Sequence, residues 1–305
     1  MNELLVDIIF ICFNRKDEVL YNIFKMGEYK LINKVICVDN HSSDGTDEIF
    51  KSLNNKNIKY IKLGKNVGIQ AYNIAASNSN ADILIILDDD SHIDEDAIPK
   101  VLNKFNNDSR LGILAFCVKL SKTGENITKD WKDGAATSFW GCGAAVRREI
   151  WNRLGGYNKD LFLYTNEYEL SIRCWNIGYK VIYDSSIIAY HRVSNMNRTT
   201  KRLIIYSIRN NTYFIKTYFD KKYHIKLLLI DRINWFIRSI MCNSVKSFLY
   251  GLVEARRFTN CIINNPVDHD IQKFYLYNSR LFELPLKKLK RKIKDGTIFN
   301  KQNLI

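Results

Sequence analysis

Three consecutive aspartates follow an apolar run in the first third of the chain. Ile83–Leu87 is continuous and β-prone, and Asp88, Asp89 and Asp90 come directly after it. Carboxylates within about 4–6 Å raise one another's pKa unless a cation neutralises them. Mg²⁺ or Mn²⁺ does this, because both favour oxygen ligands and keep positions open for substrate phosphates. The triplet predicts a metal site, with a solvated acidic loop as the alternative; side-chain alternation would turn Asp88 and Asp90 one way and Asp89 the other.

The apolar run before the aspartates is one of a series of expected strands. Such runs alternate with segments of helical spacing, which is typical of βαβ units and a parallel sheet covered on both faces. The expected strands are 6–13, 35–38, 58–63, 83–87 and 180–183, and the expected helices include 18–30, a segment ending near 53, one beginning near 69 and one at 167–177. Ligands bind beyond the carboxyl ends of parallel strands. Polar residues at the ends of the first, second and fourth strands should therefore meet at one edge.

Composition sets the broad class of the protein. The 305 residues are 46% hydrophobic with three prolines, which favours a globular α/β protein. Seven scattered cysteines without a CxxC pair indicate reduced thiols and a cytoplasmic protein. We expect neither a signal peptide nor a membrane-spanning helix. Residues 1–200 hold 25 basic and 25 acidic residues, so the whole net charge of +14 lies in 201–305, with 21 and 7.

Several motifs occur in an order that resembles glycosyltransferase family 2, whose members have the GT-A fold and a DxD motif. Asp88–Asp90 and its strand look like the DxD motif. The other matching segments, in family order, are Val6–Arg15 (VDIIFICFNR), Val35–Thr46 (VICVDNHSSDGT), Asn66–Gly68 with Asn73, Trp140–Gly156 (WGCGAAVRREIWNRLGG), Leu163–Arg173 (LYTNEYELSIR) and Ala189–His191. The resemblance covers about residues 5–192. It departs from the family at Ile11-Cys12, where a Pro-Thr pair is common.

The resemblance implies a site for a nucleoside-diphosphate sugar and for Mn²⁺ or Mg²⁺. Asp39 would bind the base or ribose, and Asp88 would lie near the ribose and the metal. Asp90 would ligate the metal and His191 would complete its coordination. The remaining residues that we assign to donor binding are Asn14, Asn66, Gly68, Asp89, Trp140 and Gly141.

The resemblance also assigns a general base. An acceptor hydroxyl is a weak nucleophile until its proton is removed as it attacks the anomeric carbon. Glu167 aligns with the family's basic carboxylate, and a single displacement of this kind inverts the anomeric configuration. Glu169 is the competing candidate, and Asn166 replaces the first acid of the usual pair. Acidic enrichment in the first turn of a helix is the structural alternative for both glutamates.

The basic last third permits three interpretations. It is a solvated helical face, an amphipathic surface on anionic lipid, or a nucleic-acid surface, the last being the weakest. Oligomer-forming helices would have the same composition. The densest block of charge is Lys287–Lys294. Family members often act on lipid-linked or polymer acceptors, which favours peripheral contact with the inner face of the plasma membrane.

The sequence therefore predicts a GT-A α/β domain in 1–200 and a helical, basic region in 201–305. The predicted activity is inverting transfer from a nucleotide sugar, UDP-linked by family habit, to a glycan, lipid-linked or protein-linked acceptor in a bacterial polysaccharide pathway. A sugar-1-phosphate nucleotidyltransferase is the first rival, although residues 8–17 lack the glycine-rich phosphate loop of that class. A non-catalytic protein that binds nucleic acid or lipid is the second.

Overall fold

The computed structural model describes residues 4–53, 55–194, 199–260 and 262–284. The chain forms two compact units. The first is Met1–Phe162 with Asn166–Asn197, and the second is Leu163–Thr165 with Arg198–Ile305. None of the described helices combines the length and the apolarity that a membrane span requires.

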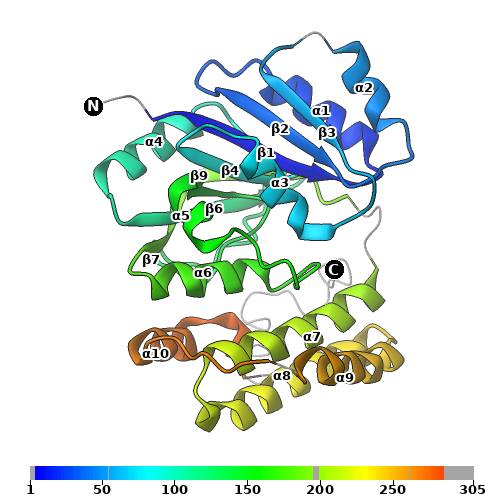
Figure 1. Ribbon diagram of the computed structural model, residues 1–305, viewed down its shortest axis with the longest axis vertical. Coiled ribbons are helices and arrows are strands. Elements are labelled where there is room, and N and C mark those ends of the chain that lie inside the picture. Colours follow the sequence, from blue (N-terminus) through cyan, green and yellow to red (C-terminus); the bar gives the residue numbers. More distant parts are fainter. Residues whose placement is uncertain (1–3, 54, 195–198, 261, 285–305) are drawn as a thin grey trace. The chain divides into compact units, whose positions relative to one another are not determined.

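The first unit is an α/β structure built on a nine-stranded sheet (Figure 1). Its strands are β1 (Val6–Cys12), β2 (Lys34–Asp39), β3 (Ile58–Lys62), β4 (Ile83–Asp88), β5 (Ser91–Ile93), β6 (Leu111–Leu120), β7 (Gly134–Ala135), β8 (Ala144–Arg147) and β9 (Lys180–His191). Its helices are α1 (Lys16–Met26), α2 (Thr46–Ser52), α3 (Ala71–Ser77) after the 3₁₀ turn η1 (Gly68–Gln70), α4 (Ala97–Asn107), α5 (Arg148–Leu154) and α6 (Asn166–Asn176).

The strand order is β3-β2-β1-β4-β8-β6-β9-β5, and β7 pairs with β9. The first four strands are parallel, as the sequence predicted. β8 is antiparallel to both β4 and β6, whereas β9 is parallel to β6, so the sheet as a whole is mixed. These directions bring the start of β8 and the end of β9 to the edge at which β1, β2 and β4 end.

Side chains alternate between two cores, one on each face of the sheet. Ile8 and Phe10 of β1 pack with residues of α1, α2 and α4, whereas Ile9 between them packs with residues of α3, α5 and α6. Because both faces are covered, the central strands are apolar throughout. This explains why uninterrupted apolar runs identified them in the sequence.

Two element boundaries differ by four residues or more from those predicted. α1 ends at Met26 rather than at residue 30, and Gly27, a poor helix former, follows it. β9 continues eight residues beyond the predicted end at 183. Asp184-Ser185-Ser186 has the composition of a turn, but a register shift opposite Phe116 and Cys117 accommodates these residues within the strand.

The second unit is helical. It contains α7 (Thr200–Tyr218), α8 (Lys221–Met241), α9 (Val245–Thr259), α10 (His269–Asn278) and the 3₁₀ turn η2 (Arg280–Phe282). Ile204 and Ile208 of α7 pack against Phe248 and Ala255 of α9. Gly251 allows a close approach, because a Cβ there would lie 3.0 Å from Ile208 Cδ1. The whole basic block Lys287–Lys294 and the rest of the C-terminus lie outside the described residues.

Candidate active site

The carboxyl ends of three strands lie side by side in the first unit. Cys12 at the end of β1 pairs with Asp39 at the end of β2, and Ile11 pairs with Asp88 at the end of β4. The sheet register therefore gathers the polar residues that follow these strands, as the parallel arrangement requires.

Asp39 is fully buried and organises the turn after β2. Its Oδ1 accepts a hydrogen bond from the Ser42 amide at 2.7 Å, and its Oδ2 accepts one from the Tyr60 hydroxyl at 2.6 Å. Burial and the Asp39 carboxylate raise the pKa of the Tyr60 hydroxyl, which keeps it a donor. The structure thus assigns Asp39 a place in the scaffold of the turn, and its contact with a nucleotide stays a prediction.

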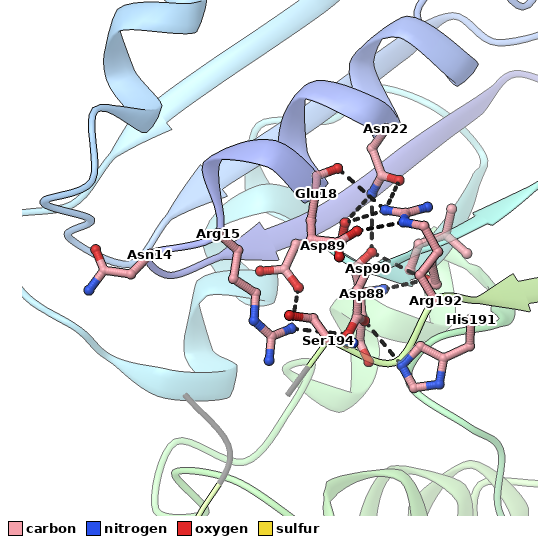
Figure 2. Close-up of polar contacts among 12 residues, drawn as sticks. Asn14, Arg15, Glu18, Asn22, Asp88, Asp89, Asp90, His191, Arg192 and Ser194 are labelled. Atoms are coloured by element: carbon pink, nitrogen blue, oxygen red, sulfur yellow. Dashed lines mark hydrogen bonds and ion pairs between the residues drawn. The ribbon is translucent and has the colours of Figure 1, made fainter. Parts of the chain in front are cut away.

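Asn14, Asn66 and Gly68 lie in the loops beside this turn. Asn14 has a left-handed backbone (φ 52°), accepts a hydrogen bond from the Ser43 amide at 2.7 Å, and points away from the aspartates (Figure 2). Asn66 is exposed and accepts a bond from the Gly68 amide at 2.8 Å. Only glycine fits at Gly68, because φ is +63° and a Cβ would lie 2.3 Å from the Phe162 carbonyl oxygen.

Asn40 joins these loops, although no role was predicted for it. Its side-chain amide donates to the Gly68 carbonyl at 3.1 Å and accepts from the Val67 amide at 3.1 Å. Asn73, in contrast, bonds to the Tyr157 backbone at 2.8 and 2.9 Å, so it fixes a loop rather than facing a ligand. The signal for Asn40 was its position directly after Asp39 in the second-strand motif.

Asp88 ends β4, and Asp89 and Asp90 form the turn before β5. The guanidinium group of Arg15 forms ion pairs with both residues of this turn. Arg15 Nη1 lies 2.7 Å from Asp89 Oδ1 and 3.2 Å from Asp90 Oδ2 (Figure 2). Asp89 and Asp90 lie in the turn after β4, and one guanidinium contacts both carboxylates, although the predicted alternation would point them to opposite sides. Burial raises the pKa of Asp89 to about 7, against the opposing effect of Arg15. Sequence reasoning placed Arg15 at the strand end but gave it no role.

Asp90 and His191 come together although 101 residues separate them. Asp90 Oδ1 lies 3.1 Å from His191 Nε2, and Asp90 Oδ2 accepts a hydrogen bond from the Ser194 amide at 2.9 Å. The antiparallel pairing of β5 with β9 sets Ser91 opposite His191 and so fixes this approach. Both side chains are buried.

Arg192 connects the same turn to α1 (Figure 2). Its guanidinium bonds to Glu18 Oε2 at 2.5 Å, to Asn22 Oδ1 at 2.8 Å and to the Asp89 carbonyl at 2.9 Å. The sequence offered Arg192 as one of several arginines that could reach a phosphate, and the structure instead shows it holding α1 to the turn. The neighbouring His92 packs against Tyr21 and Tyr190, and burial lowers the pKa of its imidazole to about 4.

The donor atoms at this edge fit a divalent cation. Asp88, Cys142 and His191 offer ligand atoms that lie within 4.8 Å of one another. The 3.1 Å between Asp90 Oδ1 and His191 Nε2 is the spacing that two adjacent ligands take when each lies about 2.1 Å from one ion. Tyr72 donates a hydrogen bond to Asp88 Oδ1 at 3.2 Å and thereby orients that carboxylate.

Glu167 lies in the first turn of α6, close to the loop before β8. A Cβ on Gly141 would lie 2.9 Å from Glu167 Oε1, so the missing side chain makes room for this carboxyl group. Burial raises the pKa of Glu167 to about 7, and the negative charge of Asp88 adds to the increase. Trp140, beside Gly141, keeps 38% of its surface exposed.

The structure separates Glu167 from its competitor Glu169. Glu169 is 1% exposed and forms an ion pair with Arg173 at 2.6 Å. Arg173 also donates to the carbonyls of Leu154 and Gly156 at 2.5 and 2.7 Å. Glu169 therefore helps to hold the end of α5, whereas Glu167 has the raised pKa of a candidate proton acceptor.

Solved structures of several glycosyltransferases share this fold. GalNAc-T7, in a crystal structure with UDP, GalNAc and Mn²⁺, is 14% identical with a TM-score of 0.61; the match covers 84% of this chain and 57% of that one. The mannosyltransferase PcManGT from Pyrobaculum calidifontis, in complex with GDP-Man and Mn²⁺, is 16% identical with a TM-score of 0.58 and coverages of 98% and 86%.

A third similar structure is S. aureus TarS 1-349 in complex with UDP-GlcNAc, which is 11% identical with a TM-score of 0.61 and coverages of 97% and 93%. At these identities the likeness establishes a GT-A-like fold. No curated protein matches the chain. The sequence profile of glycosyl transferase family 2 matches residues 7–175, more than half of the chain. The chain therefore belongs to glycosyl transferase family 2.

Proposed function

We propose that this protein transfers a sugar from a nucleoside-diphosphate sugar to an acceptor hydroxyl with inversion at the anomeric carbon. The observation that carries the proposal is the gathering at one sheet edge of two different kinds of carboxyl group. Asp89 and Asp90 form ion pairs with Arg15, and Asp90 also meets His191, whereas the Glu167 carboxyl group lies against Gly141. Burial raises the pKa of both Asp89 and Glu167 to about 7, but only Asp89 has a protein cation beside it. Carboxyl groups in contrasting environments are typical of sites that divide charge stabilisation from proton transfer.

Donor binding is assigned to the loops that follow β1, β2 and η1 and to the loop before β8. Asp39, Asn14, Asn66 and Gly68 would hold the nucleotide, and Asp88 and Asp89 would lie at the ribose and diphosphate. Trp140 and Gly141 would contact the transferred sugar. The UDP, UDP-GlcNAc and GDP-Man bound in the similar structures support a nucleotide-sugar donor, and we favour UDP.

Asp88, Asp90 and His191 would hold Mn²⁺ or Mg²⁺. Such an ion supplies positive charge that stabilises the departing diphosphate. Arg15 contributes a second, permanent positive charge beside Asp89 and Asp90. It lowers the repulsion among the carboxylates and so keeps the turn folded before a cation binds.

Glu167 would accept the proton of the acceptor hydroxyl. The acceptor oxygen forms a bond to the anomeric carbon while the bond from that carbon to the diphosphate oxygen breaks. The proton moves to the Glu167 carboxylate, and the electron pair leaves with the nucleoside diphosphate. A base with a pKa near the working pH is well matched to this transfer.

We assign the acceptor to the glycan, lipid-linked or protein-linked class, in a bacterial polysaccharide pathway. The α8–α9 face supports peripheral contact with an anionic membrane in the cytoplasm. We define this face by Ile225, Leu229, Phe236 and Ile240 of α8 and by Leu249 and Val253 of α9, which are all exposed at 43% or more. Lys222, Lys226 and Lys246 are exposed on the same helices.

A panel of nucleotide sugars tests the proposal directly. Purified protein with Mn²⁺ should slowly hydrolyse one donor and release its nucleotide even without the true acceptor, and a chelator should stop the release. Asp90→Asn should abolish the metal-stimulated turnover. Calorimetry in which neither Mn²⁺ nor Mg²⁺ assists the binding of any nucleotide would overturn the proposal.

A further inference from the structure

Cys142 lies among the donor atoms of the candidate metal site. Its sulfur, a carboxylate oxygen of Asp88 and a ring nitrogen of His191 lie within 4.8 Å of one another. Cys142 is 2% exposed and belongs to the loop before β8, whereas Asp88 ends β4 and His191 ends β9. Three separate elements therefore deliver an oxygen, a sulfur and a nitrogen to one place.

The backbone on either side holds Cys142 in this position. The Gly143 amide donates to the Trp140 carbonyl at 3.0 Å and closes a tight loop, and the Phe116 amide donates to the Gly143 carbonyl at 3.0 Å. A Cβ on Gly143 would lie only 2.7 Å from the Cβ of Ala189, two residues before His191. The absence of a side chain at Gly143 thus brings the Cys142 loop against β9.

We propose that Cys142 is a metal ligand, so that Asp88, His191 and a cysteine sulfur bind the same divalent cation. The inference rests on the proposed function, because it adds a ligand to the cation site proposed there. As the metal–sulfur bond forms, the thiol releases its proton to solvent. A thiolate is a soft ligand, and it favours Mn²⁺ and still more Co²⁺ or Zn²⁺ over the hard cation Mg²⁺.

The other cysteines have different surroundings. Cys12 and Cys37 face each other with their sulfurs 3.6 Å apart, and burial raises the pKa of the Cys37 and Cys174 thiols, that of Cys174 to about 12. Cys117 on β6 is 2% exposed, like Cys142. Among the described residues only Cys142 belongs to a group of three potential metal ligands, so Cys117 is a control of equal burial.

Cobalt gives a readout that does not depend on turnover. The full-length protein is titrated with Co²⁺ in the presence of UDP, and sulfur-to-cobalt charge-transfer absorption is recorded in the near ultraviolet. The wild-type protein and Cys117→Ser should show the absorption, and Cys142→Ser should lose it. Calorimetry should show that Cys142→Ser binds Mn²⁺ more weakly, by at least the roughly 10–100-fold that the loss of a residue supporting a ligand typically costs, while its Mg²⁺ affinity changes less.

The outcomes separate this inference from the proposed function. If Co²⁺ binds with UDP but the wild-type protein has no charge-transfer absorption, or if Cys142→Ser retains it, Cys142 is not a ligand and the proposed function stands. If no divalent cation binds, with or without UDP, both fail. If Cys142→Ser does not fold, X-ray absorption of the wild-type protein with Co²⁺ decides, because a sulfur neighbour supports the inference and its absence overturns it.

Discussion

The two units depart from the usual distribution of polar and apolar groups in opposite ways. The α/β unit buries charge: Asp90 is 0% exposed and Asp89 is 6% exposed. The helical unit exposes apolar surface instead, with Ile225 at 83% and Leu229 at 58%. Buried carboxylates need partners, and large apolar patches on a surface commonly mark an interaction site.

The two units also differ in the groups that stabilise these unusual residues. In the α/β unit, Arg15, His191 and backbone amides meet the buried carboxylates, so the structure itself satisfies much of the charge. The helical unit also buries an ion pair, between Asp231 and Arg232, with Asn211 donating to Asp231 at 2.7 Å. The α8–α9 face consists of exposed apolar side chains, and exposed lysines lie on the same two helices, a combination that suits the proposed contact with an anionic membrane.

Glu167→Gln should give the largest effect on catalysis. The variant keeps the shape of the side chain but cannot accept the acceptor proton, so kcat should fall by about 10²–10⁴-fold while calorimetry shows unchanged donor affinity. Glu169→Gln is the control, because it weakens the ion pair with Arg173. This variant should have a lower melting temperature than the wild type, and its kcat should fall far less than that of Glu167→Gln. Equal activity of Glu167→Gln and wild type would remove Glu167 from the role of base.

Arg15→Met should give the largest effect on stability. The change leaves Asp89 and Asp90 buried without their cation, and breaking a buried ion pair costs about 3–5 kcal/mol. Denaturant unfolding should measure this loss. Saturating Mn²⁺ with UDP should recover part of it, because another cation then neutralises the aspartates; a variant as stable as wild type without metal would contradict the neutralising role of Arg15.

The pH dependence of activity and that of stability should have opposite signs. Glu167 must be ionised to act as a base, so kcat/KM should rise with pH through about 7, the value to which burial raises its pKa. The folded state binds this proton more tightly than the unfolded state, so the contribution of Glu167 to stability should fall as pH rises from about 4.5 to 7.

Glu167→Gln should remove the pH dependence of activity and the part of the stability dependence that Glu167 contributes, whereas Asp89, whose pKa burial also raises to about 7, should keep its own part. Kinetic and thermal unfolding profiles of the variant and the wild type, measured in the same buffers, check this. If the residual kcat/KM of the variant still rises with pH through about 7, another group is responsible for the pH dependence of activity.

The smallest expected effects concern the α8–α9 face. Leu229→Glu with Phe236→Glu should abolish co-sedimentation with vesicles that contain anionic lipid. Lys222→Gln and Lys226→Gln should each weaken it by about 1 kcal/mol, or roughly fivefold, because each removes one basic charge. Phe24→Glu is the matched control in the α/β unit, because Phe24 is 73% exposed on α1. An equal loss of vesicle binding in Phe24→Glu, or binding to neutral vesicles alone, would contradict an anionic-membrane surface. If the protein instead forms dimers at higher concentration, the face is an interface with a second copy of the chain.

The sequence by itself determined the parallel core and the position of the aspartates. Ile83–Leu87 lies within β4 as predicted, because a strand that is covered on both faces must be apolar throughout, and this requirement is local. The ordered motifs also identified the family that the profile match shows. Glu167 was selected through that resemblance, since the acidic first turn of α6 did not by itself distinguish it from Glu169.

Only the tertiary structure decided which groups meet across long separations in the chain. Arg15 reaches aspartates 74 and 75 residues away, and Cys142 comes beside His191 because Gly143 lets its loop pack against β9. The spacing of apolar residues along α8 likewise does not reveal which face stays exposed. The pattern of apolar residues shows which side of a segment must be buried, because that requirement is local. The packing of strands and helices determines which distant residues contact that segment.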